Sequence, residues 1–427
     1  MKPVGKSVGI EDISAYLGLA YVEVDDLFRA RGMDTSRMAN LMMRRKTVAL
    51  PCEDVVSCAV NAARPLLGRL DERELETIEL LVVGTESGLD LSKATATWIH
   101  ELLQLPRTCR LFEVKQACYA GVAALQLATA QIATASREDA RALVIGCDVP
   151  RLIRGSTAEP SQGAGAVAVL VGPERTLATA ELGAAGYCSF DVGDVRRPTP
   201  VDHIWDPDLS LMSYVECLKA AYGDYVRRRP DTDFLGSFDH LAFHTPFPGA
   251  VRGAHRSLLR SLGRIPPQRV TEDFGRRLED SIRYPAQVGN IYAGTTLLAL
   301  LSLFDHTKAD PAATGRIGIF SYGSGCSSEF CSYLLNPAAQ PRSSGVADAL
   351  AARARLDVSA YDEIADACDP LCAGVADFEG DLSLARKLAP AVSPGHPLTM
   401  LERIEGHERH YVQLDVQPDV QRDGGLS

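Results

Sequence analysis

The sequence RLFEVKQACYAGVAAL, residues 110–125, changes character at a single cysteine. The apolar run before Cys118 is typical of a β-strand, and the small residues after it are typical of a helix. At the start of a helix, the helix dipole stabilises the thiolate form of a cysteine, and the backbone N–H groups there can hold an oxyanion. Two interpretations of Cys118 therefore stay open here: a small apolar residue in a strand-to-helix corner, or a nucleophile.

The segments on either side repeat this order of strand, turn and helix. IELLVVGTES (78–87) predicts a strand that ends in a turn, and LSKATATWIHELLQL (91–105) predicts a helix. RALVIGCDV (141–149) and GAGAVAVLV (163–171) predict two more buried strands. The N-terminal part of the chain is therefore predicted to be an α/β layer.

The second half shows a similar succession of elements. LAFHTPF (241–247) predicts a strand followed by a helix, NIYAGTTLLALLSLFDH (290–306) predicts a long helix, and RIGIFSYGSG (316–325) with EFCSYLL (329–335) predicts paired strands around a glycine turn. We expect two similar layered halves that share one core, over residues 1–172 and 173–427. The second includes a C-terminal extension, predicted to pack as helices and to fray over its last residues, 417–427.

Composition narrows the class of protein. The 427 residues are 46% apolar and 23% charged, which is ordinary for a globular protein, and the formal net charge of −11 disfavours a nucleic-acid partner. The sequence lacks a secretory signal pattern and any run of about 18 apolar residues, so we expect a cytoplasmic protein without a membrane partner. The eleven cysteines have no framework or metal-site spacing, so most are expected to be reduced, and no metal is predicted.

Four further residues could carry chemistry with Cys118, and each has a plain structural alternative. Glu86 and His244 follow apolar strands, where ligands gather in α/β sheets, although Glu86 also fits a turn and a lone histidine is more often structural. Asn290 precedes an apolar helix and fits an N-cap. Ser324 lies in a glycine turn whose N–H groups could face an anion, or which simply closes a hairpin. The order Cys, His, Asn also fits a papain-like protease, but no CGSCW-like context surrounds Cys118.

Taken together, these stretches resemble the 3-hydroxy-3-methylglutaryl synthases of the thiolase superfamily, the HMG-CoA synthase-like enzymes. The resemblance runs from about Val8 to Phe330 in the family's order, through GTESGLDLSK, FEVKQACYAGVAAL, AEPSQGAGAVAVLVG, HTPFPGAVRGAHR, VGNIYAGT and FSYGSGCSSEF. FEVKQACYAG, HTPFPGAVRGAHR, RRPTP and LSLMSYVECL are most similar to the branch that installs β-branches on carrier-protein-bound polyketides. The resemblance implies a thiolase fold, a five-layered αβαβα subunit of two pseudo-equivalent halves that usually forms a homodimer.

The resemblance also implies roles for the candidate residues. Cys118 would be the nucleophile, Glu86 the general acid/base, and His244 and Asn290 polarising partners, while the backbone N–H groups of Cys118 and Ser324 would hold an oxyanion. An acidic residue in this position separates aldol condensation from the Claisen condensation of ketoacyl synthase III enzymes, which use Cys, His and Asn alone. No bound cofactor is implied, because the substrates are phosphopantetheine thioesters.

The implied partners are an acetyl-donor acyl carrier protein and an acceptor acyl carrier protein of a polyketide synthase. Because carrier proteins are acidic, we expect a local basic rim on the helix after His244, formed by Arg252, His255, Arg256 and Arg260. One departure from the family concerns the acceptor: Leu152 stands where the family often has an aromatic residue, and the loop from it to Ala158 is shorter than in the polyketide branch.

Two alternatives remain open. The first is the mevalonate-pathway HMG-CoA synthase, which uses acetyl-CoA and acetoacetyl-CoA. The second, from another class, is an inactive thiolase-fold scaffold that binds carrier proteins. The scaffold is disfavoured because competent residue types stand at all four chemical positions.

Overall fold

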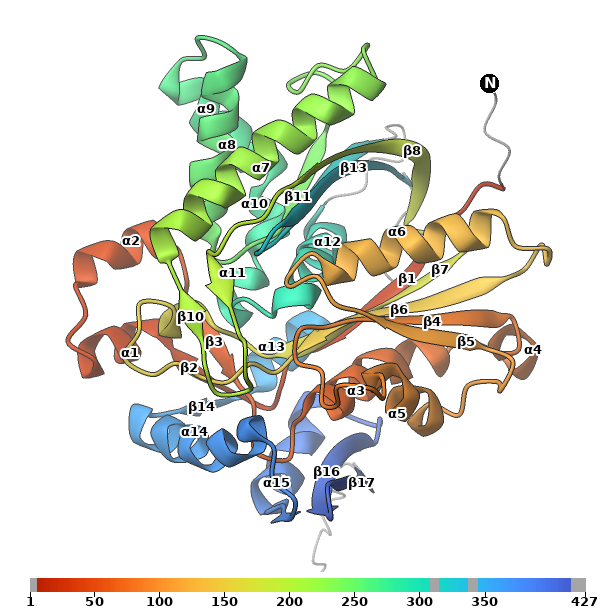
Figure 1. The fold of residues 1–427 in the computed structure, drawn as a ribbon, viewed down its shortest axis with the longest axis vertical. Coiled ribbons are helices and arrows are strands. Elements are labelled where there is room, and N and C mark those ends of the chain that lie inside the picture. Colours follow the sequence, from red (N-terminus) through yellow and green to blue (C-terminus); the bar gives the residue numbers. More distant parts are fainter. Residues whose placement is uncertain (1–5, 308–314, 337–344, 416–427) are drawn as a thin grey trace, which may run out of the picture.

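A computed structural model describes residues 6–307, 315–336 and 345–415, and its centre is a nine-stranded sheet (Figure 1). The strand order is β11-β12-β13-β8-β1-β7-β6-β4-β5. The strands are β1 (Gly9–Tyr16), β4 (Ile78–Gly84), β5 (Arg110–Val114), β6 (Arg141–Asp148), β7 (Gly165–Gly172), β8 (Ala178–Ser189), β11 (His240–Phe243), β12 (Arg316–Gly323) and β13 (Ser327–Leu335).

Strand β8 joins two parts of this sheet. Its first residues pair with β1, as in Ile10↔Ala178, and most of its length pairs with β13. On one side lie β1, β7, β6, β4 and β5, and on the other lie β13, β12 and β11. Every residue of β6 and β7 is buried, which is the burial expected of strands covered on both faces.

Helices cover both parts of the sheet and fill the space between them. Helices α3 (Val55–Leu67) and α5 (Thr95–Leu102) lie on the outer face of the β1–β5 part, and α7 (Pro207–Arg228) and α8 (Pro248–Leu262) lie beyond the other part (Figure 1). Helices α6 (Ala120–Ala133) and α12 (Thr295–His306) form the middle layer. The five-layered αβαβα arrangement is therefore confirmed.

The middle layer is close-packed because its contact residues are small. A Cβ atom added at Gly121 of α6 would lie 2.0 Å from the carbonyl oxygen of Ala293, and one added at Gly146 of β6 would lie 2.8 Å from the same atom. Helix α12 itself is apolar on all sides, and its residues from Thr295 to Phe304 are buried. This packing fixes the segment before α12 against the ends of β4 and β6.

The C-terminal extension packs against the N-terminal part of the chain. Strand β14 pairs in parallel with β2 (Ala20–Glu23), and β16 packs on α3. Helices follow residue 345 as expected, but the antiparallel pair β16–β17 was not predicted, and residues 417–427 lie outside the described part. The elements of the extension are α13 (Val346–Ala352), β14 (Ala354–Leu356), α14 (Val358–Ala373), β15 (Phe378–Glu379), α15 (Ser383–Val392), β16 (Leu398–Glu405) and β17 (Glu408–Leu414).

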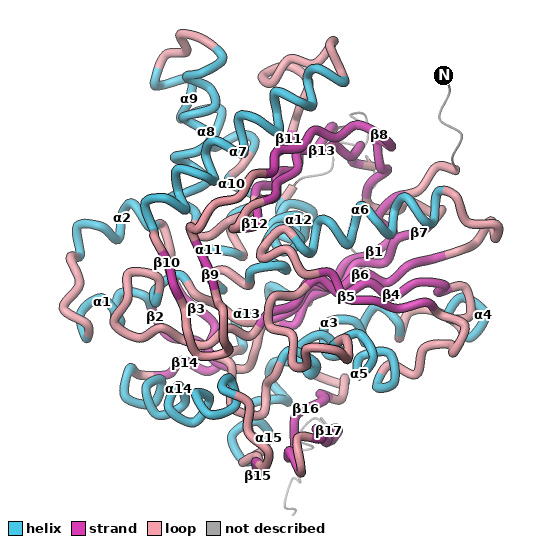
Figure 2. Tube along the Cα trace, in the orientation of Figure 1, coloured by secondary structure: helices cyan, strands magenta, loops and turns pink. Residues whose placement is uncertain are grey.

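Shorter helices, strands and loops lie around the central sheet (Figure 2). Within the described part of the chain, no helix combines the length and the apolar character needed to cross a bilayer. The remaining elements are α1 (Val24–Ala30), α2 (Met38–Leu41), β3 (Arg45–Val48), α4 (Glu72–Leu75), β9 (Val195–Arg196), β10 (Ile204–Trp205), α9 (Pro267–Arg277), α10 (Glu279–Ile282) and α11 (Pro285–Val288), with 3₁₀ turns at Thr35–Arg37, Glu159–Ser161 and Tyr292–Gly294.

Candidate active site

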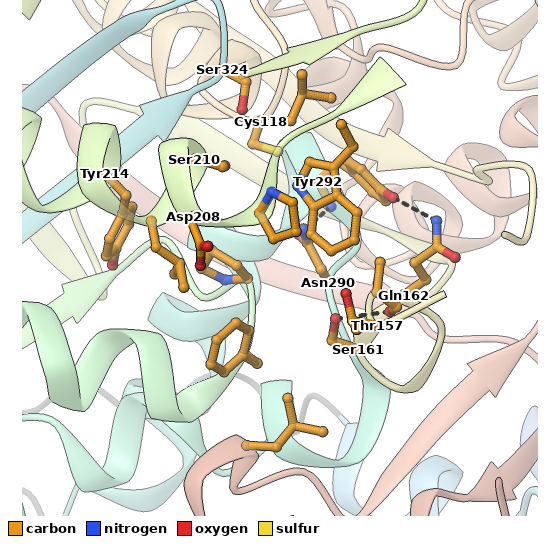
Figure 3. Close-up of a pocket in the computed structure, with 18 of the residues that line it drawn as sticks. Cys118, Thr157, Ser161, Gln162, Asp208, Ser210, Tyr214, Asn290, Tyr292 and Ser324 are labelled. Atoms are coloured by element: carbon orange, nitrogen blue, oxygen red, sulfur yellow. Dashed lines mark hydrogen bonds between the residues drawn. The ribbon is translucent and has the colours of Figure 1, made fainter. Parts of the chain in front are cut away.

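The five residues singled out in the sequence line one cavity of about 830 Å³. Glu86 follows β4 and His244 follows β11, while Cys118 lies between the end of β5 and the start of α6. Asn290 comes before α12, and Ser324 occupies the turn between β12 and β13. Figure 3 shows Cys118 and Ser324 at the same end of the cavity, with Asn290 below them. The layered fold thus brings together residues from both halves of the sequence.

The loop that carries Cys118 has an unusual backbone. Ala117 has a φ of 45°, in the left-handed region that residues other than glycine seldom adopt. The β12–β13 turn closes tightly on this loop, because a Cβ atom added at Gly323 would lie 2.2 Å from the carbonyl oxygen of Gln116. The nucleophile loop and the Ser324 turn are therefore held together as one unit.

The Cys118 thiol is buried, with 8% of the residue exposed. Burial raises its pKa well above the ordinary value, the negative charges of Glu86 and Asp148 raise it further, and a hydrogen bond from the Asn290 side chain lowers it. The thiol is therefore protonated in the free protein. A base must accept its proton when the sulfur attacks a thioester.

His244 is a neutral imidazole in the free protein, so its ring has a nitrogen lone pair that can take a proton. Burial lowers its pKa to about 3, so the ring carries no charge at neutral pH. Its backbone is fixed on both sides, since its N–H donates to the Phe320 carbonyl at 2.7 Å and its carbonyl accepts from the Tyr214 hydroxyl at 2.7 Å. In the described part of the chain, no hydrogen-bond partner lies within reach of its Nδ1 atom.

Glu86 has a carboxyl group that favours the protonated form. Burial is the main cause of its raised pKa, the nearby charge of Asp148 adds to it, and Arg197 opposes it. Arg197 also donates to the backbone carbonyl of Glu86. A carboxyl group with a raised pKa can exchange a proton near neutral pH, which is what a general acid/base requires.

Asp148 is a site residue that the sequence analysis did not single out. It is fully buried and accepts hydrogen bonds from the Thr85 hydroxyl at 2.9 Å, the Glu86 backbone N–H at 2.8 Å and the Ala293 backbone N–H at 2.9 Å. It thereby joins the Glu86 loop to the segment before α12. Its position after the apolar strand of RALVIGCDV is the same signal that identified Glu86 and His244.

Asn290 is not the N-cap of α12 that its place in the sequence suggested, because Gly294 occupies that position. Its Oδ1 accepts from the Tyr292 backbone N–H at 2.9 Å and from the Thr295 hydroxyl at 2.8 Å. Its side chain therefore stabilises the turn that leads from Asn290 into the 3₁₀ turn at Tyr292–Gly294, whose N-cap is Ile291. Because these bonds occupy the oxygen, the amide NH₂ group is left to interact with Cys118.

Segments that the sequence analysis did not assign to the site form the rest of the cavity wall. In Figure 3, Gln162 points toward Tyr292, and its Nε2 donates to the Tyr292 hydroxyl at 3.1 Å. The wall residues have no common sequence signal, since they come from four separate segments of the chain that include parts of α1, β10 and α7. They include Phe28, Met33, Asp34, Arg37, Thr157, Ala158, Ser161, His203, Trp205, Asp208, Leu211 and Phe247.

The basic rim on α8 needs one correction. Arg252, Arg256 and Arg260 are exposed, but His255 is fully buried, with its Nε2 2.8 Å from Asp273 Oδ2. His255 shares the inward face of α8 with buried apolar residues one turn before and after it. The prediction that His255 contacts a carrier protein is therefore wrong.

Comparisons with known proteins agree with this geometry. The family model described as hydroxymethylglutaryl-coenzyme A synthase N terminal matches residues 4–176, and the C-terminal model matches residues 260–364. The chain belongs to the hydroxymethylglutaryl-coenzyme A synthase family. Its members are acyl-transferring condensing enzymes, and the fold is the thiolase fold.

The similarity extends over most of the chain. It is 40% identical to the polyketide biosynthesis 3-hydroxy-3-methylglutaryl-ACP synthase PksG of Bacillus subtilis, over 95% of this chain and 99% of PksG. The hydroxymethylglutaryl-CoA synthase of Enterococcus faecalis is 34% identical, over 76% of this chain and 82% of that protein. The structure of the curacin pathway HMG synthase with acetyl donor-ACP matches with a TM-score of 0.90 and 41% identity, covering 96% of this chain and all of the other.

The synthase chemistry requires a thiol, a carboxyl group and an imidazole, and all three are present in the cavity. Among the described residues, no group of three or more His, Cys, Asp and Glu side chains is arranged to hold a metal ion. The departure at Leu152 lies outside the cavity lining, since this side chain packs against the apolar cluster of Val22, Leu27, Val48 and Tyr361.

Proposed function

We propose that this synthase installs carboxymethyl β-branches on polyketide chains. It transfers acetyl from an acyl carrier protein to Cys118, adds the acetyl carbon to the β-ketone of a carrier-bound acceptor, and releases the enzyme by hydrolysis. The observation that carries the proposal is the presence of Cys118, Glu86 and a neutral His244 in one cavity. The carrier-protein specificity is supported by the identity to PksG over nearly the whole chain.

The first step is acetyl transfer. The Cys118 sulfur attacks the donor thioester, and its proton passes to the His244 imidazole and then to the pantetheine thiolate that leaves. The carbonyl oxygen becomes negative in the tetrahedral intermediate. The backbone N–H groups of Cys118 and Ser324 would stabilise it, since both residues lie at one end of the cavity (Figure 3).

The second step forms the carbon–carbon bond. Glu86, as the carboxylate, removes a methyl proton from acetyl-Cys118, and the enolate carbon attacks the acceptor ketone. The new alkoxide takes a proton, so a tertiary alcohol forms. His244, assisted by Asn290, would hydrogen-bond the acceptor oxygen while this charge develops.

The third step is hydrolysis of the remaining thioester. Water attacks the carbonyl carbon on Cys118, the C–S bond breaks, and the free carboxylate leaves on the acceptor. This step makes the overall aldol addition effectively irreversible. Cys118 returns to its thiol form for another cycle.

The partners follow from this role. We propose docking of acidic carrier proteins at the exposed arginines of α8, Arg252, Arg256 and Arg260. A homodimer is also proposed, supported by β5, the last strand in the sheet order, which leaves one edge open for a second copy. A cytoplasmic location accords with the supply of carrier-bound substrates.

The acetyl donor can be tested by intact-protein mass spectrometry. The synthase is exposed briefly to acetyl-carrier protein or to acetyl-CoA, with Cys118→Ser as the control. We expect an acetyl adduct that requires Cys118 and forms much faster from the carrier protein. Faster acetylation by acetyl-CoA would favour the mevalonate-pathway alternative, and no adduct from either donor would favour the inactive scaffold.

A further inference from the structure

Arg31 lies at a junction of three parts of the chain. It follows α1, and its guanidinium contacts two carboxylates at once. Its Nε and Nη2 donate to Glu159 at 3.1 and 2.9 Å, and its Nη1 donates to Asp362 of α14 at 3.0 Å. A planar guanidinium fits such paired contacts, which a lysine cannot reproduce.

Glu159 fixes one wall of the cavity. The residue is fully buried, and its Oε2 accepts the Gly155 backbone N–H at 2.7 Å. Its backbone carbonyl accepts from the buried Lys46 ammonium at 2.8 Å, and the same ammonium donates to the Tyr361 hydroxyl at 3.2 Å. The residues on both sides of it face the cavity: Thr157, Ala158, Ser161 and Gln162.

The chain on the other side of Arg31 forms a second wall. Phe28 precedes it in α1, and Met33, Asp34 and Arg37 follow it, and all four line the same cavity. Arg31 itself is not in the lining and is mostly covered, with 18% of its side chain exposed. The Arg31 side chain therefore connects the 28–37 wall to the 155–162 wall without itself lining the cavity.

Helix α14 supports this junction from the C-terminal extension. Asp362, Asp366 and Asp369 are spaced so that they share one face of the helix. They pair with Arg31, with Arg154 and with Arg151, and the last two belong to the loop that leads into Glu159. The Asp366–Arg154 and Asp369–Arg151 pairs are partly exposed, so each contributes little to stability. The Arg31–Glu159 pair is buried.

We propose that Arg31 is a positioning residue that fixes the 28–37 wall and the 155–162 wall relative to each other, so that the cavity between them takes a phosphopantetheine arm. Removing it takes away the guanidinium that pairs with the buried Glu159 carboxylate, and Lys46, which donates to the Glu159 backbone carbonyl, does not replace those bonds. The loop 153–162 must then move or open to solvate that charge. Because the catalytic residues sit on other loops, the change should affect the fit of both substrates more than the chemistry. The proposal rests on the function proposed above.

The test is steady-state kinetics of the full-length enzyme with acetyl-carrier protein and acetoacetyl-carrier protein. In Arg31→Gln, we expect KM for both substrates to rise about tenfold, a loss of roughly 1.4 kcal/mol of binding, while kcat changes less than about threefold. Amide hydrogen exchange in residues 153–162 should become at least about tenfold faster, as expected for a loop that opens locally. Arg31→Lys should recover only part of the KM effect, because the paired contacts are not restored.

Two further variants keep the interpretation unambiguous. Arg29→Gln removes an arginine of α1 whose ion pairs, within the described residues, are with Asp25 and Asp26 of that helix, and it should leave KM and exchange unchanged. The double variant Arg31→Gln, Glu159→Gln removes both charges, so it leaves no unpaired carboxylate buried. It is used in place of the single variant if that one is unstable. An unchanged KM in folded Arg31→Gln and in the double variant would overturn the proposal. A wild-type enzyme without activity on carrier-bound substrates would instead refute the proposed function.

Discussion

Three ionisable side chains of the cavity, Cys118, Glu86 and His244, have pKa values shifted in the direction that keeps each of them neutral. Burial is the main cause for all three, because the low dielectric disfavours every charged form. These three reacting groups are therefore uncharged before a thioester binds. Charge then develops only as the thiol, the methyl group and the ketone react, and the backbone N–H groups stabilise it where it appears.

The role of Glu86 predicts a separation of the reaction steps. In Glu86→Gln, acetyl-Cys118 should still form, because the acetyl transfer uses His244, but condensation should slow by about 10²–10⁴-fold, the usual contribution of a general base. The measurement combines intact-protein mass spectrometry of the acetyl adduct with product formation from acetoacetyl-carrier protein. Condensation at the wild-type rate would show that another group removes the methyl proton.

The condensation step should also depend on pH through Glu86. Only its carboxylate can accept the methyl proton, so the rate should rise with pH, and the raised pKa places the midpoint above that of an ordinary glutamate. Asp148→Asn removes a nearby negative charge and should move the midpoint to lower pH. The test is the pH profile of single-turnover condensation from pre-acetylated enzyme, and an identical midpoint in both proteins would contradict this assignment.

At the scale of elements, the close approach of the β12–β13 turn to the nucleophile loop predicts a strict need for glycine. Gly323→Ala should lower the stability by about 1–3 kcal/mol, as overpacking does, and slow acetylation, since its Cβ would collide with backbone atoms of the Cys118 loop. Gly253→Ala in α8 is the matched control. Its Cβ meets nothing within 4 Å, so it should raise stability by about 0.5–1 kcal/mol. Denaturant unfolding and the acetylation assay measure both effects.

Helix α8 presents its basic residues on one face and His255 on the other. Arg256→Glu with Arg260→Glu should weaken binding of the donor carrier protein at low salt, and the difference should shrink near 0.1 M salt, where the Debye length is about 10 Å. Arg73→Glu with Arg107→Glu, exposed residues of the other half, makes the same charge change as a control. Equal binding by both double variants, measured by titration at low salt, would place docking elsewhere.

The sequence predicted elements and site residues where the signal was local. Strands followed by a polar residue identified Glu86 and His244, and an asparagine before an apolar helix was read as a cap. Contacts between distant segments left no local signal. The closure of Gly323 on the Cys118 loop and the pairing of Arg31 with Asp362 depend on tertiary packing. His255 was misassigned because its burial follows from the face that α8 turns inward, whereas its neighbouring arginines are exposed.

At the scale of the whole molecule, the layered fold brings catalytic residues from both parts of the sheet into one cavity. The nucleophile comes from the β1–β5 part, the histidine comes from the β11–β13 part, and α12 between them positions Asn290 and Asp148. The C-terminal extension packs on the N-terminal part, and its Asp362 pairs with Arg31 next to the cavity wall. The cavity wall therefore depends on residues from both the N-terminal part and the C-terminal extension of the chain.

The central claim is that this protein condenses a carrier-bound acetyl group with a carrier-bound β-ketone. The most direct measurement is the intact mass of the acceptor carrier protein after incubation of the enzyme with acetyl-carrier protein and acetoacetyl-carrier protein. We predict a mass gain equal to one acetic acid on the acceptor, dependent on Cys118 and Glu86. An acceptor of unchanged mass in the presence of fully acetylated enzyme would contradict the account.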